Sequence, residues 1–308
     1  MTIKFVLGVL VATTISFQSR AQESDSTTST STKSLLQNKK FEETHTLTDS
    51  KLRADDGSLS RYSMKGNVSY FGPTLHDWSA ADQPNPDGSV GSYAQALKGS
   101  AMLRYRISSV STVSAGTGLA VNHPFHGWDR TDVNNPFMSY DRSIRLGQLQ
   151  MRTSPGFMIA TVPNFTTTGE VGGLTLDQST VWNIPGSRFA LSLDGNFSWW
   201  IYKRSYIPGP ISRGGDGKAQ EYSLGLFPGL KYNFSDRVSM FTSYALSFYN
   251  PRLLDDKGAL WRRTPSARLG ISYAAGRDIY VAPYLSSYPG EAFTRSTTFN
   301  LSTVFSIL

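Results

Sequence analysis

An alternation of apolar and polar side chains from Arg188 to Tyr202 constrains the fold of this chain more than any other feature. Successive side chains of a β-strand point to opposite faces, so a period of two predicts a strand with one apolar and one polar face. The segment is longer than the usual globular strand of about five or six residues. A tilted strand of about 9–11 residues crosses the hydrocarbon core of a bilayer, and aromatic residues gather at the two interfaces. Phe189 near one end and Trp199, Trp200 and Tyr202 at the other fit that description.

The same alternation recurs through the chain after residue 61 and identifies ten further segments. In the segment from 141 to 153 the phase slips near Gly147, which suggests a β-bulge. The ten segments are Tyr62–Gly72, Leu97–Ser108, Val110–Asn122, Asp141–Thr153, Val171–Trp182, Gln220–Phe234, Val238–Asn250, Trp261–Ala275, Asp278–Tyr288 and Ser296–Leu308.

The lengths of the connections indicate a twelfth strand. Short connections such as Ser108-Ser109 and Ala275–Asp278 alternate with long ones such as 123–140. Bacterial barrels keep short turns on the periplasmic side and long loops outside, and this alternation requires a further strand through Gly156–Phe165 after a turn at Thr153–Pro155. We therefore predict an all-β fold, a transmembrane antiparallel β-barrel of twelve strands with both termini in the periplasm. Ten strands is the alternative count.

The N-terminal part of the chain has a different character. Residues 1–21 have the pattern of a secretory signal peptide, with Lys4, an apolar stretch and small residues before a cleavage site. Residues 22–61 begin with a Ser/Thr tract and continue with charged residues, so they lack the apolar surface needed to fold alone. We predict a disordered, low-complexity periplasmic tail for 22–61, with a plug inside the lumen as the alternative, and a barrel for 62–308.

Composition excludes several classes of protein. Outside the N-terminus no apolar run reaches the roughly 18 residues of a transmembrane helix. The absence of cysteine removes disulfide scaffolds, thiolate metal sites and a lipoprotein anchor. The 30 basic residues outnumber the 23 acidic ones, but no basic helix or basic-aromatic run accompanies them, so we expect no nucleic-acid partner. A secreted β-sandwich is the rival fold, although it does not need so many long strands with aromatic ends.

With a signal peptide, amphipathic strands, aromatic strand ends and a final strand at the C-terminus, the chain resembles the bacterial outer-membrane β-barrel proteins as a class. The resemblance covers residues 62–308 and implies location in the outer membrane of a Gram-negative bacterium. It also implies contact with the lipid bilayer and lipopolysaccharide, and assembly by the barrel assembly machinery. One departure is the C-terminus, Phe305-Ser306-Ile307-Leu308, because the class usually ends in an aromatic residue. The architecture is shared by many functions, so it implies fold and location only.

The polar parity of the strands carries many basic residues and few acidic ones, mainly Asp194 and Glu221. A basic wall inside a low-dielectric shell attracts anions, so we predict a porin-like channel for small anionic or polar solutes. Some barrels that resemble this one in layout carry acidic oligosaccharides. The predicted basic pore-lining residues are Lys98, Arg104, Arg106, Arg145, Arg188, Lys231, Arg262 and Arg268. The predicted aromatic pore-lining residues are Trp200, Tyr202, Tyr249, Tyr280 and Tyr284, which either stack on solutes or only fill space.

Two other functions stay open. A closed barrel with a structural or surface-loop adhesion role is the first. A lipid hydrolase at the outer rim is the second, with His123, His126, His76 and Ser139 as the available residues. A nucleophile needs a base within hydrogen-bond reach and a third group to orient it, and nothing in the spacing guarantees this. We therefore predict no enzyme activity, no catalytic residues, no metal site and no cofactor.

Overall fold

A computed structural model of the chain describes residues 40–41, 47–83, 93–127, 130–167, 169–203, 220–251, 258–290 and 293–307. The expected signal peptide and the Ser/Thr tract lie outside these residues. Among the helices of the described ranges, none has the length and apolarity to cross a membrane.

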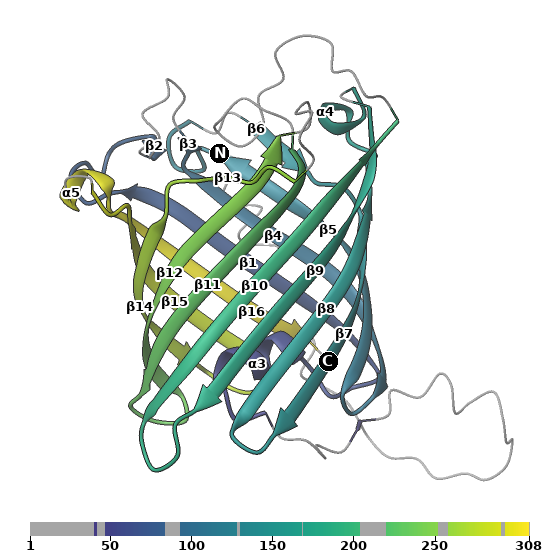
Figure 1. Cartoon of the computed structure of the whole chain (residues 1–308), viewed down its shortest axis with the longest axis vertical. Helices are drawn as coiled ribbons and strands as arrows, with labels where there is room; N and C mark the ends of the chain where they lie inside the picture. The colour runs from purple at the N-terminus through teal and green to yellow at the C-terminus, as the bar shows by residue number, and fades with distance from the viewer. Residues whose placement is uncertain are drawn as a thin grey trace, which may run out of the picture. The chain divides into compact units, whose positions relative to one another are not determined.

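Twelve antiparallel strands form a closed barrel (Figure 1). Each strand pairs with the next along the chain, and β1 pairs with β16 to close the sheet, with Val68 opposite Thr303. The predicted fold and the predicted twelve strands are confirmed. The barrel strands are β1 (Tyr62–Thr74), β4 (Ala96–Ser108), β5 (Ser111–Asn122), β7 (Phe137–Leu146), β8 (Leu149–Ile159), β9 (Glu170–Asn183), β10 (Phe189–Tyr202), β11 (Gln220–Asn233), β12 (Val238–Pro251), β14 (Ser266–Ala274), β15 (Ile279–Ser287) and β16 (Thr298–Ile307).

Smaller elements lie mostly in the connections, and one helix precedes the first strand. Short strand pairs extend the hairpins, because β6 pairs with β5 and β13 pairs with β12, while β2 and β3 pair with each other. The additional elements are α3 (Ser50–Asp56), β2 (Asp82–Gln83), β3 (Tyr93–Ala94), β6 (Arg130–Val133), α4 (Pro163–Thr166), β13 (Trp261–Arg262) and α5 (Phe293–Ser296).

The region around Gly147 differs from the prediction. A tight turn follows Leu146, which pairs with Leu149, and Gly147 has a φ of +61°, a conformation that favours glycine. The phase slip is therefore a hairpin turn and not a bulge, and the predicted turn at Thr153–Pro155 is wrong. Strand β8 runs straight through those residues to Ile159, so the twelfth strand exists with bounds different from Gly156–Phe165.

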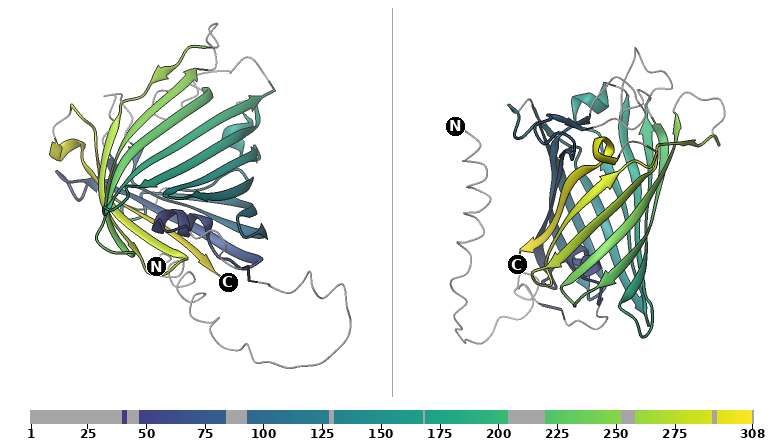
Figure 2. Two further views of the ribbon diagram at one scale, coloured as in Figure 1. Left: turned by 60° about the horizontal axis from the view of Figure 1, so that its bottom comes forward. Right: turned by 90° about the vertical axis from the view of Figure 1, so that its left-hand side faces the viewer.

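Connections differ in length at the two ends of the barrel (Figure 1). Five short turns join the hairpins β4–β5, β7–β8, β9–β10, β11–β12 and β14–β15, and the longest of these has only the residues 184–188. The other end carries the long connections, including 75–95, 123–136 and 160–169. Helix α3 lies at the end with the short turns, inside the ring of strands (Figure 2).

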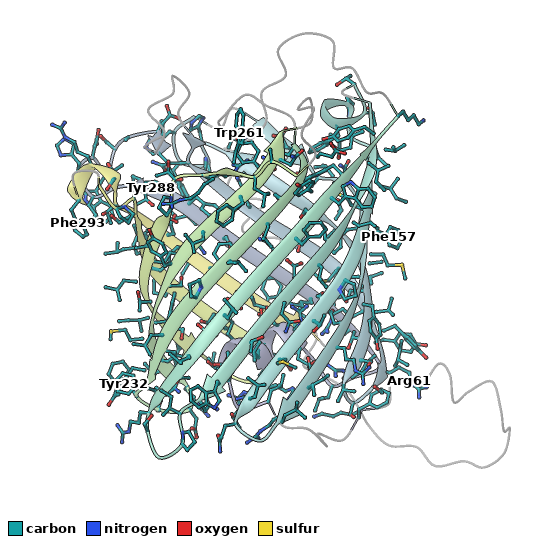
Figure 3. All side chains as sticks on the ribbon, viewed as in Figure 1. Arg61, Phe157, Tyr232, Trp261, Tyr288 and Phe293 are labelled. Carbon is teal, nitrogen blue, oxygen red and sulfur yellow. The ribbon has the colours of Figure 1, made fainter. Side chains whose placement is uncertain are left out.

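The outer surface of the barrel is apolar. In β10, Leu191 and Leu193 are 44 % and 48 % exposed on the outside, whereas Ala190 on the inward parity is fully buried. Aromatic rings gather near the short turns, where Phe189 and Tyr232 lie 4.9 Å apart between ring centroids (Figure 3). Exposed apolar side chains around a closed barrel are the surface that a bilayer covers.

Residues 47–60 differ from the tail expected for 22–61. Leu47 and Leu52 pack with Val181 and Ala190 of the barrel wall. Ala54 packs with another group on the opposite side, formed by Tyr280, Ala282 and Val304. We call the segment Leu47–Ser60 the plug. Its apolar residues are too few to form a core alone, and they become buried because the barrel supplies the other half of each contact.

Candidate functional site: the lumen and its plug

Helix α3 is short, and side-chain and backbone caps define both of its ends. The Asp49 carboxylate accepts a hydrogen bond from the Leu52 N–H at 3.0 Å, the standard arrangement for an N-cap. At the other end Gly57, with a φ of +67°, donates its N–H to the Arg53 carbonyl. An isolated helix of seven residues is unstable in water, so contacts with the barrel stabilise it.

The first anchor of the plug is Asp49. Its carboxylate accepts a hydrogen bond from the Lys231 ammonium at 2.5 Å, and both side chains are buried. The Gln150 side-chain oxygen accepts from the N–H groups of Thr48 and Asp49 at 2.7 and 3.0 Å. The same carboxylate thus caps the helix and pairs with the barrel wall.

The second anchor is Asp56 at the end of α3. Its carboxylate accepts hydrogen bonds from Arg106 at 2.9 Å, Arg277 at 3.2 Å and the Ser143 hydroxyl at 2.9 Å. Arg106 also donates to the carbonyl oxygens of Asp56 and Ser58, and only 1 % of its surface is exposed. Charge-assisted hydrogen bonds in a buried setting are strong and hold one geometry.

Two further ion pairs join the plug to the wall. The Lys65 ammonium lies 2.6 Å from the Asp55 carbonyl oxygen and 3.5 Å from its carboxylate, and it is buried. The Lys51–Asp194 pair, 2.7 Å apart, is different because its side chains are 42 % and 33 % exposed. Lys51 faces the open part of the lumen, whereas the side chains of the other three pairs are 17 % exposed or less.

Charge also shifts the acidity of the plug carboxylates. Burial raises the pKa of Asp49, but the Lys231 ammonium outweighs burial, so this pKa lies below its ordinary value of 3.8. The pKa of Asp55 is also lowered, because Lys65 and then Arg152 outweigh the effect of burial. Both carboxylates are therefore ionised at neutral pH, the state in which they pair with the barrel.

Arg104 lies against the end of the helix. A Cβ atom at Gly57 would be only 2.0 Å from an Arg104 guanidinium nitrogen, so that side chain would have to move. The nearest ion-pair contact of Arg104 is the Asp141 carboxylate at 3.9 Å, and Arg152 pairs with the same carboxylate at 2.5 Å. The three guanidinium nitrogens of Arg104 have no hydrogen-bond partner among the described residues.

The predicted basic residues fall into three groups. Arg104, Arg106 and Lys231 face inward and are buried against the plug. Lys98 and Arg268 also face inward, and neither has an ion-pair partner in the part of the chain that the structure describes. The remaining three lie near the ends of the barrel and not on its middle wall, namely Arg145, Arg188 and Arg262.

The three residues of the last group are displaced for local reasons. Arg145 has inward parity but donates to the Gly147 carbonyl oxygen in the adjacent turn. Arg188 precedes β10 in an exposed turn. Arg262 lies in β13 opposite Phe248 of β12. Phe248 pairs with Leu224 on the outward face of the sheet, so the side chain of Arg262 also belongs to the outward face.

The predicted aromatic residues all lie on the face of their strands that points into the barrel. Trp200 and Tyr202 alternate with Trp199 and Ile201, which are exposed on the outside. Tyr249 is buried near the long connections, with its ring 6.0 Å from that of Trp261. Tyr280 packs against the plug, and Tyr284 lies beside Arg268. The wall is thus partly aromatic, although Tyr249, Tyr280 and Tyr284 pack against other groups of the protein.

Acidic residues of the lumen were missed in the sequence. Asp49, Asp55 and Asp56 belong to a segment without strand periodicity. Asp141 lies on β7 and Asp177 on β9, and the pairing of both strands with β8 depends on the hairpin turn at Gly147. The sequence did contain one signal for the plug, because Asp49 precedes Leu52 at the spacing of an N-cap. No local pattern indicated that Lys231, almost two hundred residues away, is its partner.

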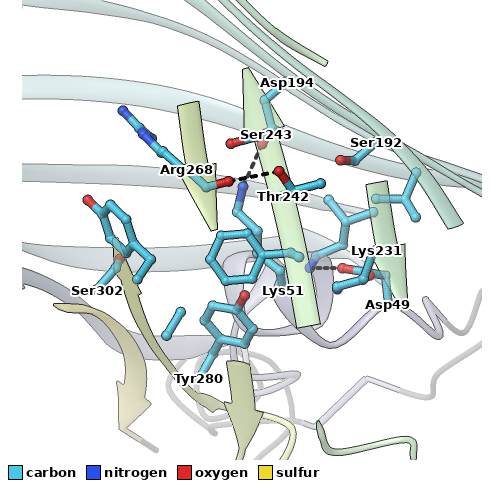
Figure 4. Close-up of a pocket in the computed structure, with 15 residues that line it drawn as sticks. Asp49, Lys51, Ser192, Asp194, Lys231, Thr242, Ser243, Arg268, Tyr280 and Ser302 are labelled. Atoms are coloured by element: carbon cyan, nitrogen blue, oxygen red, sulfur yellow. Dashed lines mark hydrogen bonds and ion pairs between the residues drawn. The ribbon is translucent and has the colours of Figure 1, made fainter. Parts of the chain in front are cut away.

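Described residues of the barrel wall and the plug line two cavities in the lumen. One has a volume of about 150 Å³ and lies between the plug and the strands from β9 to β16, with Asp194, Arg268 and Tyr284 among its lining residues (Figure 4). The other has a volume of about 410 Å³ and is lined by residues including Lys65, Asp141 and Arg152. Both have ionisable groups in their walls, so the lumen combines a filled part with polar space.

The residues available for hydrolysis are not assembled in one place. His123 lies 2.9 Å from the Asp82 carboxylate, which is a possible base and its orienting group. Ser139 lines the larger cavity, and His123 is not among the described residues that line it. Within the described ranges, no three His, Asp or Glu side chains lie close enough to hold a metal ion.

Comparisons with known proteins support the fold. No family model and no curated protein sequence matches the chain. Solved structures that match include an outer-membrane channel from Pseudomonas putida F1, with a TM-score of 0.51, 13 % identity, and coverage of 82 % of this chain and 98 % of that one. The NanC porin (TM-score 0.44, 10 % identity, 80 % and 100 % coverage) and the KdgM porin (0.39, 10 %, 80 % and 99 %) also match.

These structural neighbours are bacterial outer-membrane channels and porins. The chain has the β-barrel fold of that class, as the likeness to the Pseudomonas channel shows. At 13 % identity the likeness extends to the fold and not to the solute.

Proposed function

We propose that this protein is an outer-membrane channel through which small polar solutes diffuse, with a preference for anions. The observation that carries the proposal is the pair of inward cations, Lys98 and Arg268, that have no ion-pair partner among the described residues. Inside a low-dielectric shell an uncompensated cation raises the local concentration of anions and lowers that of cations.

The closed barrel supports the membrane part of this proposal. Its apolar exterior suits a bilayer, and short turns lie on the periplasmic side in bacterial barrels of this kind. The plug and both chain ends then face the periplasm, and the long connections face the lipopolysaccharide outside. Assembly of such a protein in the outer membrane requires the barrel assembly machinery, as for the class that it resembles.

The plug limits the expected size of the channel. Arg104, Arg106 and Lys231, which the sequence predicted as part of the selectivity wall, are buried against it. Their charges meet carboxylates, so they add little to the field that a passing solute experiences. We therefore expect a narrow pore with small conductance and an anion preference set by the two remaining cations.

The test is single-channel recording of the refolded protein without its signal peptide, in a planar bilayer with a salt gradient. We expect discrete conductance steps and a reversal potential that favours anions. The double variant Lys98→Glu, Arg268→Glu should shift the reversal potential toward cations. The matched control is Arg237→Glu in the exposed turn after β11, which should shift it little because water screens that charge.

Two results would count against the proposal. A folded barrel that gives no conductance would reject the channel and favour the closed, adhesive alternative. A conducting barrel whose reversal potential is the same in the double variant would show that Lys98 and Arg268 do not set its ion preference. Loss of lipid cleavage on His123→Ala, if the wild type cleaved lipid, would instead support the hydrolase.

A further inference from the structure

The smaller lumenal cavity has a lining that differs from the rest of the lumen. Its volume is about 150 Å³, and the plug residue Leu52 forms part of its wall. Around it lie Phe241, Tyr280, Ala282 and Tyr284 from the barrel. An apolar cavity of about this volume holds one benzene ring. The space is therefore suited to a single ring and is too small for an oligosaccharide.

The ionisable groups that line this cavity leave one positive charge without a partner. They are Asp49, Lys51, Asp194, Lys231 and Arg268. Lys51 pairs with Asp194 at 2.7 Å, and Lys231 pairs with Asp49 at 2.5 Å, as Figure 4 shows. Three cations and two carboxylates give a net charge of +1, and Arg268 is the cation that lacks an ion-pair partner in the described part of the chain.

The Arg268 guanidinium is held by aromatic rings instead of a carboxylate. Its central carbon lies 5.7 Å from the ring centroid of Phe227 and 5.7 Å from that of Tyr284. Cation–π contacts orient the guanidinium and leave its N–H groups able to donate to an anion. The Arg268 Nε atom is buried and has no hydrogen-bond partner among the described residues.

We propose that this cavity binds a small monocyclic carboxylate, with the carboxylate on Arg268 and the ring against Phe241, Tyr280 and Tyr284. One negative charge neutralises the site, and a guanidinium matches the planar geometry of a carboxylate. The hydroxyl groups of Ser192, Ser243 and Ser302 are at the walls to receive a further polar substituent. A sugar acid of the same size presents several hydroxyl groups to Leu52 and Ala282, where they lack partners.

This inference deepens the proposed function by naming a ligand class for the lumen. The plug forms part of the site, because Asp49, Lys51 and Leu52 all line the cavity. The site is therefore complete only while the plug is docked.

The experiment is isothermal titration of the refolded full chain, without its signal peptide, in detergent, using benzoate as the probe. We expect saturable binding of one benzoate per chain and binding of benzyl alcohol that is at least about tenfold weaker, since it lacks the charge. Arg268→Gln should weaken benzoate binding by about tenfold or more. Tyr284→Leu should weaken it less, because an apolar wall remains.

The control variant is Arg237→Gln, which removes the same charge from the exposed turn after β11 and should leave benzoate affinity unchanged. Heat-modifiable migration on gels checks that each variant is folded. Equal affinity for benzoate and benzyl alcohol, or an unchanged affinity in folded Arg268→Gln, overturns the proposal. Tighter binding of glucuronate than of benzoate overturns the proposal that the site prefers an apolar ring to a sugar ring.

Failure of the two proposals can be told apart. Benzoate binding by a barrel that never conducts supports the site and rejects the channel. Conductance without benzoate binding rejects the site and leaves the channel intact.

Discussion

Two groups of inward basic residues in the barrel wall are used differently. Near the plug, Arg106 and Lys231 are 1 % and 7 % exposed and pair with Asp56 and Asp49. Arg268 and Lys98 instead have aromatic rings beside them and no ion-pair partner among the described residues, the ring of Phe71 lying 5.3 Å from the Lys98 ammonium. Inward parity is therefore not sufficient to make a basic residue part of a selectivity wall. The segment that lies opposite decides whether a charge is structural or available to a solute.

Asp56→Ala is the strongest way to break this comparison. The change leaves the buried Arg106 without its carboxylate and removes one of the carboxylates beside the partly buried Arg277, and loss of one partner of a buried pair costs about 3–5 kcal/mol. We expect the plug to undock, conductance to rise several-fold and benzoate binding to be lost. Single-channel recording measures the rise in conductance that undocking of the plug should cause.

The matched control is Asp236→Ala in the exposed turn after β11, where no buried pair depends on the carboxylate. Unchanged conductance in folded Asp56→Ala would mean that the plug contributes nothing to the barrier in the lumen.

Gly57→Ala should have the next largest effect. A Cβ atom would meet Arg104 at 2.0 Å, and the backbone conformation of Gly57, with φ +67° and ψ −162°, costs a non-glycine residue about 1–3 kcal/mol. We expect a lower midpoint in urea unfolding and a moderate rise in conductance. Gly276→Ala is the control, since nothing lies within 4 Å of that position. Equal effects of the two substitutions would contradict a tight fit between Gly57 and Arg104.

Acid sharpens the comparison without a mutation. While the plug is docked, the pKa values of the Asp49 and Asp55 carboxyl groups lie below their ordinary value of 3.8. The two ionised carboxylates therefore contribute fully to docking above pH 3.8, and this contribution is lost as the pH falls through the lowered pKa values. Conductance should stay constant from pH 7 to about pH 4 and rise below it. Recordings across this range test the expectation, and a rise beginning near pH 6 would point to histidine instead.

Lys51→Met should have the smallest effect. The Lys51–Asp194 pair is partly exposed, and such pairs contribute about 0–1 kcal/mol. The matched change Lys231→Met breaks the buried pair between the barrel wall and Asp49 of the plug, and it should lower the midpoint of urea unfolding much more. If the two variants lose equal stability, burial is not what separates the two kinds of ion pair.

Much of the barrel could be predicted because the alternation of apolar and polar residues within each strand shows which face each side chain occupies. The alternation of β10 gave its bounds to within a residue, and the exposed Leu191 and Leu193 confirm which face is outside. The turn at Gly147 was harder, since one glycine in a phase slip is compatible with either a bulge or a hairpin. Pairing of Leu146 with Leu149 is decided by the neighbouring strands β5 and β9, which local sequence does not contain.

The sequence by itself determined a closed barrel with an apolar exterior, because a period of two fixes the face of every side chain once the strands exist. It also placed Lys98, Arg104, Arg106, Lys231 and Arg268 on the inward face, although it wrongly assigned Arg262 to that face. Only the tertiary structure decided which of those cations are neutralised, because Asp49 and Asp56 reach Lys231 and Arg106 across long separations in the chain. Ion pairs between distant segments produce no periodic pattern in the sequence, so the division of the inward cations into paired and unpaired ones appeared only in three dimensions.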